Sequence, residues 1–314
     1  MQLMGGMIAS LALSGCSNKT APIRIGLMVW PGYDILTLAS SLGWFDGLPI
    51  TLVDTASATE SLQLLEQGKI DAAGLSLDEV LRARDRGIDL TAILVCDISA
   101  GADQFLVRPN INSLAELKGL RIGFEDSAVG EIMFHQVLKA ADLRVEDVIR
   151  VPLTIDKHLE AWKAGTVDAI ATYEPAAGHI ANLGGKVIFD SRAIPDLIVD
   201  LLAVKTSLLD PARETLLKLV EMHFKALSYL TTNSGDAAYR LAPRFKLPPE
   251  EALSVYRGLV LPDAANNHRL LGTVHPALSR SVDADSEVLQ KIGILRQPPR
   301  KEHLLTPDFL PRLT

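Results

Sequence analysis

Polar and aromatic side chains follow five short apolar runs, where each run gives way to a turn. The first of these turns is Trp-Pro-Gly-Tyr at residues 30–33, in which Pro and Gly favour a tight turn that projects two aromatic rings. Aromatic rings suit flat or cationic groups, and carboxylates suit a ligand with an amine or another cation. The candidate ligand-binding residues are Trp30, Tyr33, Ser76, Asp78, Ser99, Asp103, Glu125, Ser127, Tyr173 and Glu174.

Each type of candidate also has a structural interpretation. Trp30 and Tyr33 could cover the core instead of a ligand. Ser76 is the first residue of a capping box, so its side chain caps a helix whether or not a ligand binds. Asp78 and Glu174 could interact only with the dipoles of the helices that follow them.

Motifs for catalysis and for metal binding are missing from the sequence. It has no Gly-x-Ser-x-Gly, no phosphate-binding loop, no Gly-x-Gly-x-x-Gly and no His-Glu-x-x-His. The seven histidines never fall three, four or five residues apart, which argues against a local zinc site. We therefore expect no catalytic residue, no metal and no cofactor, and a binding protein rather than an enzyme.

The elements that must position the candidates alternate between short apolar runs and helical segments, which predicts βαβ units and a mainly parallel sheet. The predicted strands cover residues 23–29, 50–53, 70–75, 91–95, 121–124, 149–153, 167–173, 187–189 and 201–204. The predicted helices cover residues 34–42, 59–67, 76–86, 129–141, 157–164, 210–230, 237–245, 249–260 and 281–291. Ligands of open α/β sheets bind at the carboxyl ends of the strands, so we expect all five turns to face one cleft.

An internal echo predicts two similar lobes. Residues 68–72 read Gly-Lys-Ile-Asp-Ala and residues 165–169 read Gly-Thr-Val-Asp-Ala, 97 positions further on. The two aspartates, Asp71 and Asp168, are expected to hold turns and not to bind ligand. We assign residues 23–107 and 200–314 to lobe one and 108–199 to lobe two. Crossovers near 105–110 and 194–200 would form the hinge.

Composition narrows the class of protein. The 314 residues carry a formal net charge of -7, with 48% hydrophobic and 22% charged residues, as in a globular protein of about two domains. The acidic balance argues against a nucleic-acid partner. Two cysteines cannot build a disulfide framework, and Cys96, inside an apolar run, is expected in the core.

The N-terminus is typical of an exported protein. A short apolar stretch ends in Leu-Ser-Gly-Cys at residues 13–16 and resembles the bacterial lipoprotein box. That resemblance implies a signal peptide at 1–15, a lipid on Cys16, a linker at 16–22 and anchoring to an envelope membrane. A plain signal peptide, or an apolar end with an incidental cysteine, is the alternative. No basic residue precedes Lys19, so we hypothesise that translation starts upstream of Met1.

Six stretches in a fixed order resemble the periplasmic substrate-binding proteins of ABC importers, in the nitrate, sulfonate, taurine and thiamine-precursor group. They are residues 30–33 (WPGY), 68–72 (GKIDA), 97–103 (DISAGAD), 113–119 (SLAELKG), 165–169 (GTVDA) and 173–175 (YEP). The resemblance covers about residues 23 to 205. It implies an α/β type II periplasmic-binding-protein fold and a periplasmic monomer whose two lobes close on a small solute. It also implies docking on a permease that works with an ATPase.

Charge at the candidate turns bears on the solute. Several carboxylates around a purely anionic ligand would leave unpaired buried charge, so nitrate or a bare alkylsulfonate is disfavoured. We predict an amine- or pyrimidine-bearing solute, and a zwitterion such as taurine, which also bears a sulfonate, stays open. The alternatives are a fold-related enzyme of pyrimidine or menaquinone biosynthesis, or a ligand-sensing domain.

Overall fold

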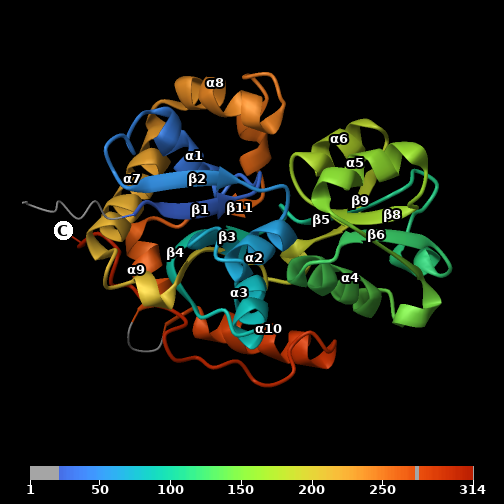
Figure 1. The fold of residues 1–314 in the computed structure, drawn as a ribbon. Coiled ribbons are helices and arrows are strands. Elements are labelled where there is room, and N and C mark those ends of the chain that lie inside the picture. Colours follow the sequence, from blue (N-terminus) through green and yellow to red (C-terminus); the bar gives the residue numbers. More distant parts are fainter. Residues whose placement is uncertain (1–20, 273–275, 314) are drawn as a thin grey trace, which may run out of the picture.

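Two β-sheets, each covered by helices, stand side by side in the computed structural model (Figure 1), which describes residues 21–272 and 276–313. The predicted signal peptide, Cys16 and most of the predicted linker lie outside the described residues. No described helix is long and apolar enough to cross a membrane. Cys96 is buried in a strand of the first sheet, as predicted.

The first sheet has the order β11-β4-β10-β3-β1-β2. β1 runs parallel to β2 and β3, whereas β10 runs antiparallel between β3 and β4, and β11 runs antiparallel to β4. The strands are β1 (Ile23–Leu27), β2 (Ile50–Asp54), β3 (Ala72–Ser76), β4 (Leu90–Ser99), β10 (Val199–Lys205) and β11 (Leu259–Val260).

The second sheet has the order β7-β6-β8-β5-β9, with β6 parallel to β7 and β8, and β5 antiparallel to β8 and β9. Its strands are β5 (Gln104–Val107), β6 (Arg121–Glu125), β7 (Ile149–Leu153), β8 (Ala169–Thr172) and β9 (Lys186–Asp190). Because β5 already belongs to this sheet, the first crossover lies before Gln104. Our predicted boundary after residue 107 was therefore wrong by the length of one strand.

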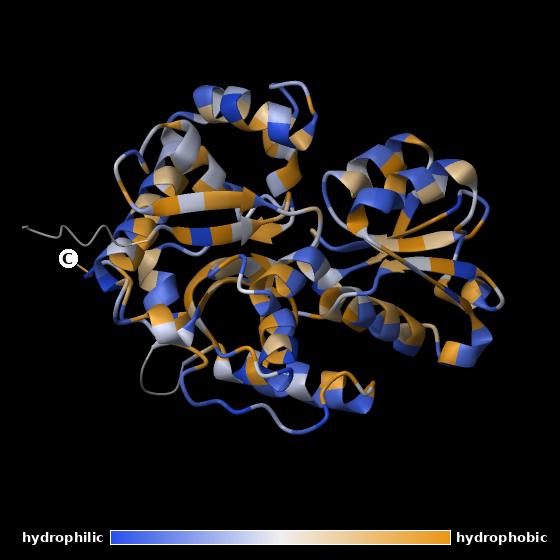
Figure 2. Cartoon of the chain, viewed as in Figure 1, coloured by the Kyte–Doolittle hydropathy of each residue, from blue (hydrophilic) through white to orange (hydrophobic). Residues whose placement is uncertain are grey.

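Helices cover both sides of each sheet. In Figure 1, α5 and α6 lie on one side of the second sheet and α4 on the other, while α10 packs against α3 beside the first sheet. Apolar and polar residues alternate along the ribbons of these helices (Figure 2), as is typical of amphipathic helices that cover a sheet. The helices are α1 (Asp34–Ser41), α2 (Ala58–Glu66), α3 (Leu77–Asp85), α4 (Ala128–Ala140), α5 (Ile155–Ala164), α6 (Ala176–Asn182), α7 (Arg213–Thr232), α8 (Ser234–Phe245), α9 (Ala264–Leu271) and α10 (Ser279–Lys291).

The predicted helix at residues 249–260 is wrong. The segment instead forms a short 3-10 helix, Ala252–Tyr256, and then β11, which pairs with the end of β4. Between them stands Gly258, with φ +84°, where an added Cβ would lie 2.6 Å from the backbone carbon of Gly101. Ala100 N also donates to Gly258 O at 2.7 Å. A side chain at residue 258 would collide with the crossover, and the positive φ favours glycine, so a helix cannot continue through this position.

The internal echo corresponds to one ion pair that is repeated in both sheets. In β1, Arg24 Nε and Nη2 donate to the two Asp71 oxygens at 2.8 and 2.7 Å. In β6, Arg121 makes the same two bonds to Asp168 at 2.9 and 2.7 Å. The aspartates have a structural role, as predicted, but they hold the arginine of a neighbouring strand and not only a turn. The repeat also includes Arg-Ile-Gly at 24–26 and at 121–123, which the sequence analysis missed.

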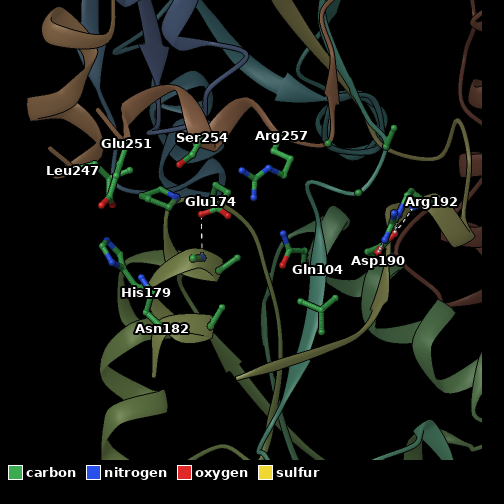
Figure 3. Close-up of a pocket in the computed structure, with 18 residues that line it drawn as sticks. Gln104, Glu174, His179, Asn182, Asp190, Arg192, Leu247, Glu251, Ser254 and Arg257 are labelled. Carbon is green, nitrogen blue, oxygen red and sulfur yellow. Dashed lines mark hydrogen bonds and ion pairs between the residues drawn. The ribbon is translucent and has the colours of Figure 1, made fainter. Parts of the chain in front are cut away.

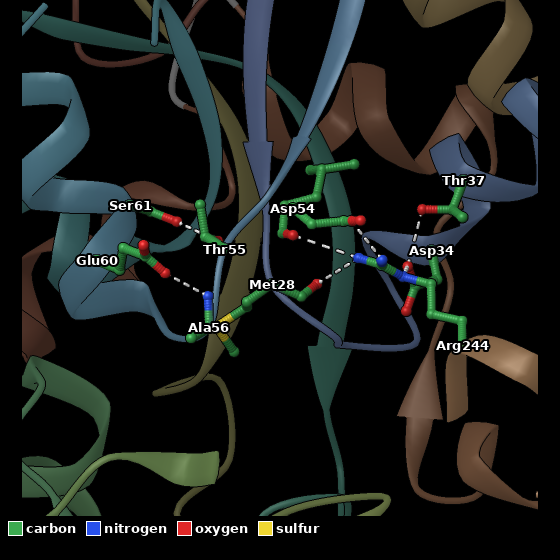
Figure 4. Close-up of polar contacts among 10 residues, drawn as sticks. Met28, Asp34, Thr37, Asp54, Thr55, Ala56, Glu60, Ser61 and Arg244 are labelled. Carbon is green, nitrogen blue, oxygen red and sulfur yellow. Dashed lines mark hydrogen bonds and ion pairs between the residues drawn. The ribbon is translucent and has the colours of Figure 1, made fainter. Parts of the chain in front are cut away.

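Arg244 of α8 clamps the carboxyl ends of β1 and β2 (Figure 4). Its guanidinium donates to Asp34 at the start of α1, to Asp54 Oδ1 at 2.6 Å, and to the Met28 carbonyl at 3.2 Å. Asp34 is fully buried, and burial raises its pKa to about 6 despite the guanidinium. The clamp fixes the point where the chain leaves β1 for the Trp-Pro-Gly-Tyr turn.

Candidate ligand-binding site

Strand ends from both sheets meet around a small, mostly buried cavity, which we call the interlobe cavity. Its volume is about 20 Å³, room for one water-sized group. The first sheet contributes the ends of β1 and β3 and the start of β10, and the second sheet contributes the ends of β6 and β8. The lining residues are Met28, Trp30, Ser76, Glu79, Asp103, Glu125, Ser127, Val129, Tyr173, Ile198 and Asp200.

Two buried carboxylates hold the Trp-Pro-Gly-Tyr turn at the first-lobe side of this cavity. Trp30 Nε1 donates to Asp97 Oδ2 at 2.9 Å, and the Tyr33 hydroxyl donates to Asp200 Oδ1. The turn approaches β4 so closely that a Cβ on Gly32 would lie 1.6 Å from Asp97 Oδ2. The glycine of the motif is therefore required by packing against a carboxylate.

Asp97 and Asp200 are directly opposite each other in the antiparallel pair of β4 and β10. Burial raises the pKa of Asp97 to about 7, and burial together with the charge of Asp97 raises the pKa of Asp200 well above its usual range. The pair therefore holds at least one proton at neutral pH.

The second lobe presents an aromatic ring and a carboxylate. The Tyr173 ring meets the Trp30 ring edge to face, with 5.1 Å between centroids, and its hydroxyl donates to Glu125 Oε2 at 3.2 Å. Burial raises the pKa of Glu125 to about 7. Ser127 Oγ accepts from Gly130 N at 3.2 Å and caps α4. The opposing rings close one side of the cavity.

The cavity is acidic. Four carboxylates line it: Glu79, Asp103, Glu125 and Asp200. Glu79 accepts a hydrogen bond from Ser76 N at 3.1 Å. Burial raises the pKa of Asp103 to about 6. No Lys, Arg or His is among the described lining residues. No three or more metal-ligating side chains come together to hold a metal ion within the described ranges. The arrangement suits an organic cation better than an anion.

A second small space of about 10 Å³ adjoins the interlobe cavity and shares Asp103, Glu125, Val129 and Tyr173 with it. His158 lines this space, fully buried, with Nδ1 3.0 Å from Thr172 Oγ1. Burial lowers the pKa of His158 to about 4, so the ring is neutral at neutral pH.

The part of the chain that carries these walls matches a known family. The family model described as NMT1/THI5 like matches residues 30–237, more than half of the chain. The chain belongs to the NMT1/THI5-like family. The matched stretch begins at Trp30 itself and includes every residue that lines the interlobe cavity except Met28.

Curated relatives of this NMT1/THI5-like chain carry names of binding proteins. One, from Escherichia coli (strain K12), is provisionally named an aliphatic sulfonates-binding protein and is 27% identical over 138 residues, 43% of each chain. Another, provisionally named a binding protein, from Brucella abortus (strain 2308), is 23% identical over 184 residues, 57% of this chain and 55% of the relative. The chain thus spans about half the length of the curated relatives it matches.

Solved structures show the fold of this NMT1/THI5-like chain. The alkanesulfonate-binding protein SsuA from Xanthomonas axonopodis pv. citri aligns with a TM-score of 0.73 at 19% identity, over 93% of this chain and 99% of that chain. SsuA from Escherichia coli aligns with a TM-score of 0.74 at 17% identity, over 92% and 98%. The desulfurization enzyme DSZB aligns with a TM-score of 0.66 at 16% identity, over 92% and 97%. The fold is that of type II periplasmic binding proteins, as predicted, and it also serves an enzyme.

Six of the ten predicted site residues line the interlobe cavity of this NMT1/THI5-like chain: Trp30, Ser76, Asp103, Glu125, Ser127 and Tyr173. Tyr33 lies in the core, where its ring packs over Gly74 of β3 and its hydroxyl donates to Asp200. Ser99 joins the two crossovers, with its Oγ 2.7 Å from Ser191 Oγ. Asp78 is fully buried in α3 and does not line the cavity.

Glu174 faces a different and larger space, which we call the outer groove. The outer groove has a volume of about 800 Å³ and lies between α6 and residues 247–258 (Figure 3). Glu174 and His179 line it from the second lobe, and Glu251 and Arg257 from the first. Glu174 Oε2 accepts from Gly178 N at 3.0 Å, so the side chain caps the first turn of α6, and Glu174 is not among the residues that line the interlobe cavity.

Sequence reasoning missed three carboxylates of the site. Glu79 was assigned only to the capping box, which it does form. Asp97 and Asp200 stand inside otherwise apolar strands, Leu-Val-Cys-Asp-Ile-Ser and Val-Asp-Leu-Leu. A lone charge in a buried strand is costly, and this would have been the signal for a functional or paired carboxylate in this NMT1/THI5-like chain.

Proposed function

We propose that this chain is the solute-binding component of an ABC importer, and that it captures a small organic solute in the interlobe cavity. The observation that carries the proposal is the convergence of both lobes on one cavity, with Trp30 and Ser76 from one side and Glu125 and Tyr173 from the other. The names of the curated relatives and the SsuA structures support solute capture as the role. A permease and an ATPase would be the partners.

The solute we propose bears a cationic nitrogen, as an amine or a pyrimidine. Four lining carboxylates and the absence of basic side chains from the described lining would leave a sulfonate without a counter-charge. Relatives are named for sulfonates, so this chain would differ from them in the charge of its solute.

Capture would involve closure of the two lobes about the crossovers. The crossovers, residues 100–103 and 191–198, connect the sheets, and the Ser99 and Ser191 hydroxyls join them. In this proposal lobe one comprises residues 23–103 with 199–314, and lobe two residues 104–198. Residues 1–15 would be a signal peptide and Cys16 a lipid anchor in the periplasm, followed by a linker at 16–22.

A fold-related enzyme is the competing class, since DSZB shares the architecture. Neither Ser76 nor Ser127 is hydrogen-bonded to a histidine in the described part of the chain, so the cavity offers no activated Ser–His pair. The carboxylates and rings that line it are groups that bind and orient a cation.

Mass spectrometry of the solute released from the purified protein by heat tests the proposal. We expect a small nitrogen-bearing compound that raises the melting temperature when it is added back. At 100 times its Kd such a ligand stabilises by about 2.7 kcal/mol, which is several degrees. The variant Tyr173→Ala should lose the solute, whereas Tyr229→Ala, whose ring packs on Trp44 outside the cavity, should keep it. A preparation that neither carries nor binds any solute would refute the proposal.

A further inference from the structure

Two carboxylate oxygens at the interlobe cavity are buried and have no hydrogen-bond partner among the described residues. They are Asp103 Oδ2, from the first crossover, and Glu125 Oε1, from the end of β6. The two residues are only 3% and 4% exposed. Buried carboxylate oxygens without donors are costly, so a bound group that donates hydrogen bonds would remove that cost.

The other oxygen of Glu125 is already in use. Glu125 Oε2 accepts from the Tyr173 hydroxyl at 3.2 Å, and the carboxylate is thereby held at the cavity wall. Asp103 is held through its backbone, whose N–H donates to Ser99 Oγ at 3.2 Å. Glu125 is therefore fixed through its side chain and Asp103 through its backbone, and both residues line the interlobe cavity and the small space beside it.

The space available restricts the group that these oxygens can hold. The interlobe cavity has a volume of about 20 Å³ and the adjoining space about 10 Å³, which is room for one or two water-sized groups. An ammonium group is about the size of a water molecule and carries several N–H donors. A pyrimidine ring would require the lobes to stand further apart. A quaternary ammonium has the charge but no N–H, and it is larger.

We propose that the interlobe cavity seats a primary ammonium group between Asp103 Oδ2 and Glu125 Oε1, so that the solute is a small primary amine. This rests on the proposed function and selects one of its two solute classes. The N–H groups donate to one oxygen from each side of the cleft, and binding therefore ties the crossover to the second lobe. Met28, Val129 and Ile198 supply the apolar part of the lining, against which the carbon next to the ammonium group would pack.

Calorimetric titration of the wild-type protein with a methylation series tests the donors without any variant. The series is methylammonium, dimethylammonium, trimethylammonium and tetramethylammonium, with ethanesulfonate and 4-aminopyrimidine as solutes of the other classes. We expect the affinity to fall at each loss of an N–H, and to be lost at the quaternary member. Equal or rising affinity along the series would overturn the ammonium seat.

Variants of Asp103 and Glu125 test the proposed position of the ammonium group. Glu125→Gln and Asp103→Asn keep the shape of each side chain and should each weaken methylammonium binding about tenfold or more. Asp285→Asn is the matched control, because Asp285 is also buried and unpartnered in the described chain but lies on α10 and does not line the cavity. It should bind within about twofold of wild type.

The outcomes separate the two proposals. If ethanesulfonate or 4-aminopyrimidine binds and methylammonium does not, the ammonium seat is wrong while solute capture stands. If Glu125→Gln and Asp103→Asn bind as the control does, the seat is also wrong. If none of the compounds binds and no solute is released by heat, both proposals fail.

Discussion

Asp97 and Asp200 lie opposite each other on β4 and β10, and each accepts a hydrogen bond from one aromatic side chain of the same turn. Trp30 binds the first and Tyr33 the second. Two buried carboxylates on directly opposite strand positions cannot both be ionised at low cost, so at least one of them keeps a proton. The pair thus supports one wall of the cavity and makes the stability of the protein depend on pH.

Stability of the ligand-free protein should fall as the pH rises from about 5 to about 8. Asp97, Asp103 and Glu125 have pKa values of about 7, 6 and 7 in the folded chain, above the usual range of a carboxyl. These carboxyls bind more protons in the folded chain than in the unfolded chain over this interval. They outweigh the buried His158 and His223, whose lowered pKa values act in the opposite sense, so ∂ΔG/∂pH of unfolding is negative. Urea unfolding at pH 5 and pH 8 measures the difference.

The variant Asp97→Asn should reduce that slope. Asparagine keeps an acceptor for Trp30 Nε1 and offers a donor to Asp200. The repulsion between the two carboxylates is therefore removed, and the hydrogen bond from Trp30 is kept. We expect a gain at pH 8 of about 1 kcal/mol or more relative to pH 5. An unchanged difference between the two pH values would show that Asp97 is not a source of the slope.

Gly32→Ala should destabilise the turn. Its new Cβ would overlap Asp97 Oδ2, at 1.6 Å, and the carboxylate would have to move away from Trp30. Overpacking of this kind costs about 1–3 kcal/mol, measured by urea unfolding. The control is Gly235→Ala in α8, where a Cβ meets no atom within 4 Å and alanine is the better helix former. Equal effects of the two substitutions would contradict the close approach.

The fold could be predicted further than the site. Alternating apolar runs gave the βαβ units, and the echo at residues 68–72 and 165–169 marked the two sheets, because Asp71 and Asp168 hold equivalent strands. Local signals such as these survive in the sequence. The sequence did not indicate that β5 belongs to the second sheet. β5 is a short apolar strand next to a crossover, and its sheet is set by pairing with β8 and β9, which are distant in the sequence.

The site depends on contacts between distant residues. Turn positions correctly brought Trp30, Glu125 and Tyr173 together, because parallel strands end at one edge. Side-chain direction was beyond a single sequence: Tyr33 turns inward to Asp200, 167 residues away, and Glu174 turns back to Gly178. The direction of these side chains is set by tertiary hydrogen bonds and not by the local sequence pattern.

Arg244→Ala should destabilise the protein strongly. The guanidinium is mostly buried and is the ion-pair partner of the fully buried Asp34. Removing one member of a buried pair leaves the other without compensation, at a cost of about 3–5 kcal/mol in urea unfolding. Arg240→Ala, on the same helix and paired with Asp236 at the surface, should change stability little. A comparable loss in both variants would contradict a specific role for the clamp.

Binding of an amine should weaken as the pH falls below about 7, and Tyr173→Phe should move that midpoint upward. An ammonium competes with the proton on Glu125, whose pKa of about 7 is raised by burial and held down in part by the Tyr173 hydroxyl. Without the hydroxyl the carboxyl keeps its proton to a higher pH, so binding is lost earlier on acidification. Methylammonium titrations from pH 6 to pH 8.5 give both midpoints. Glu174→Gln serves as the control, because Glu174 lines the outer groove, and its profile should overlay that of wild type. A flat wild-type profile, or a midpoint that moves downward in Tyr173→Phe, would show that the amine does not compete with a proton on Glu125.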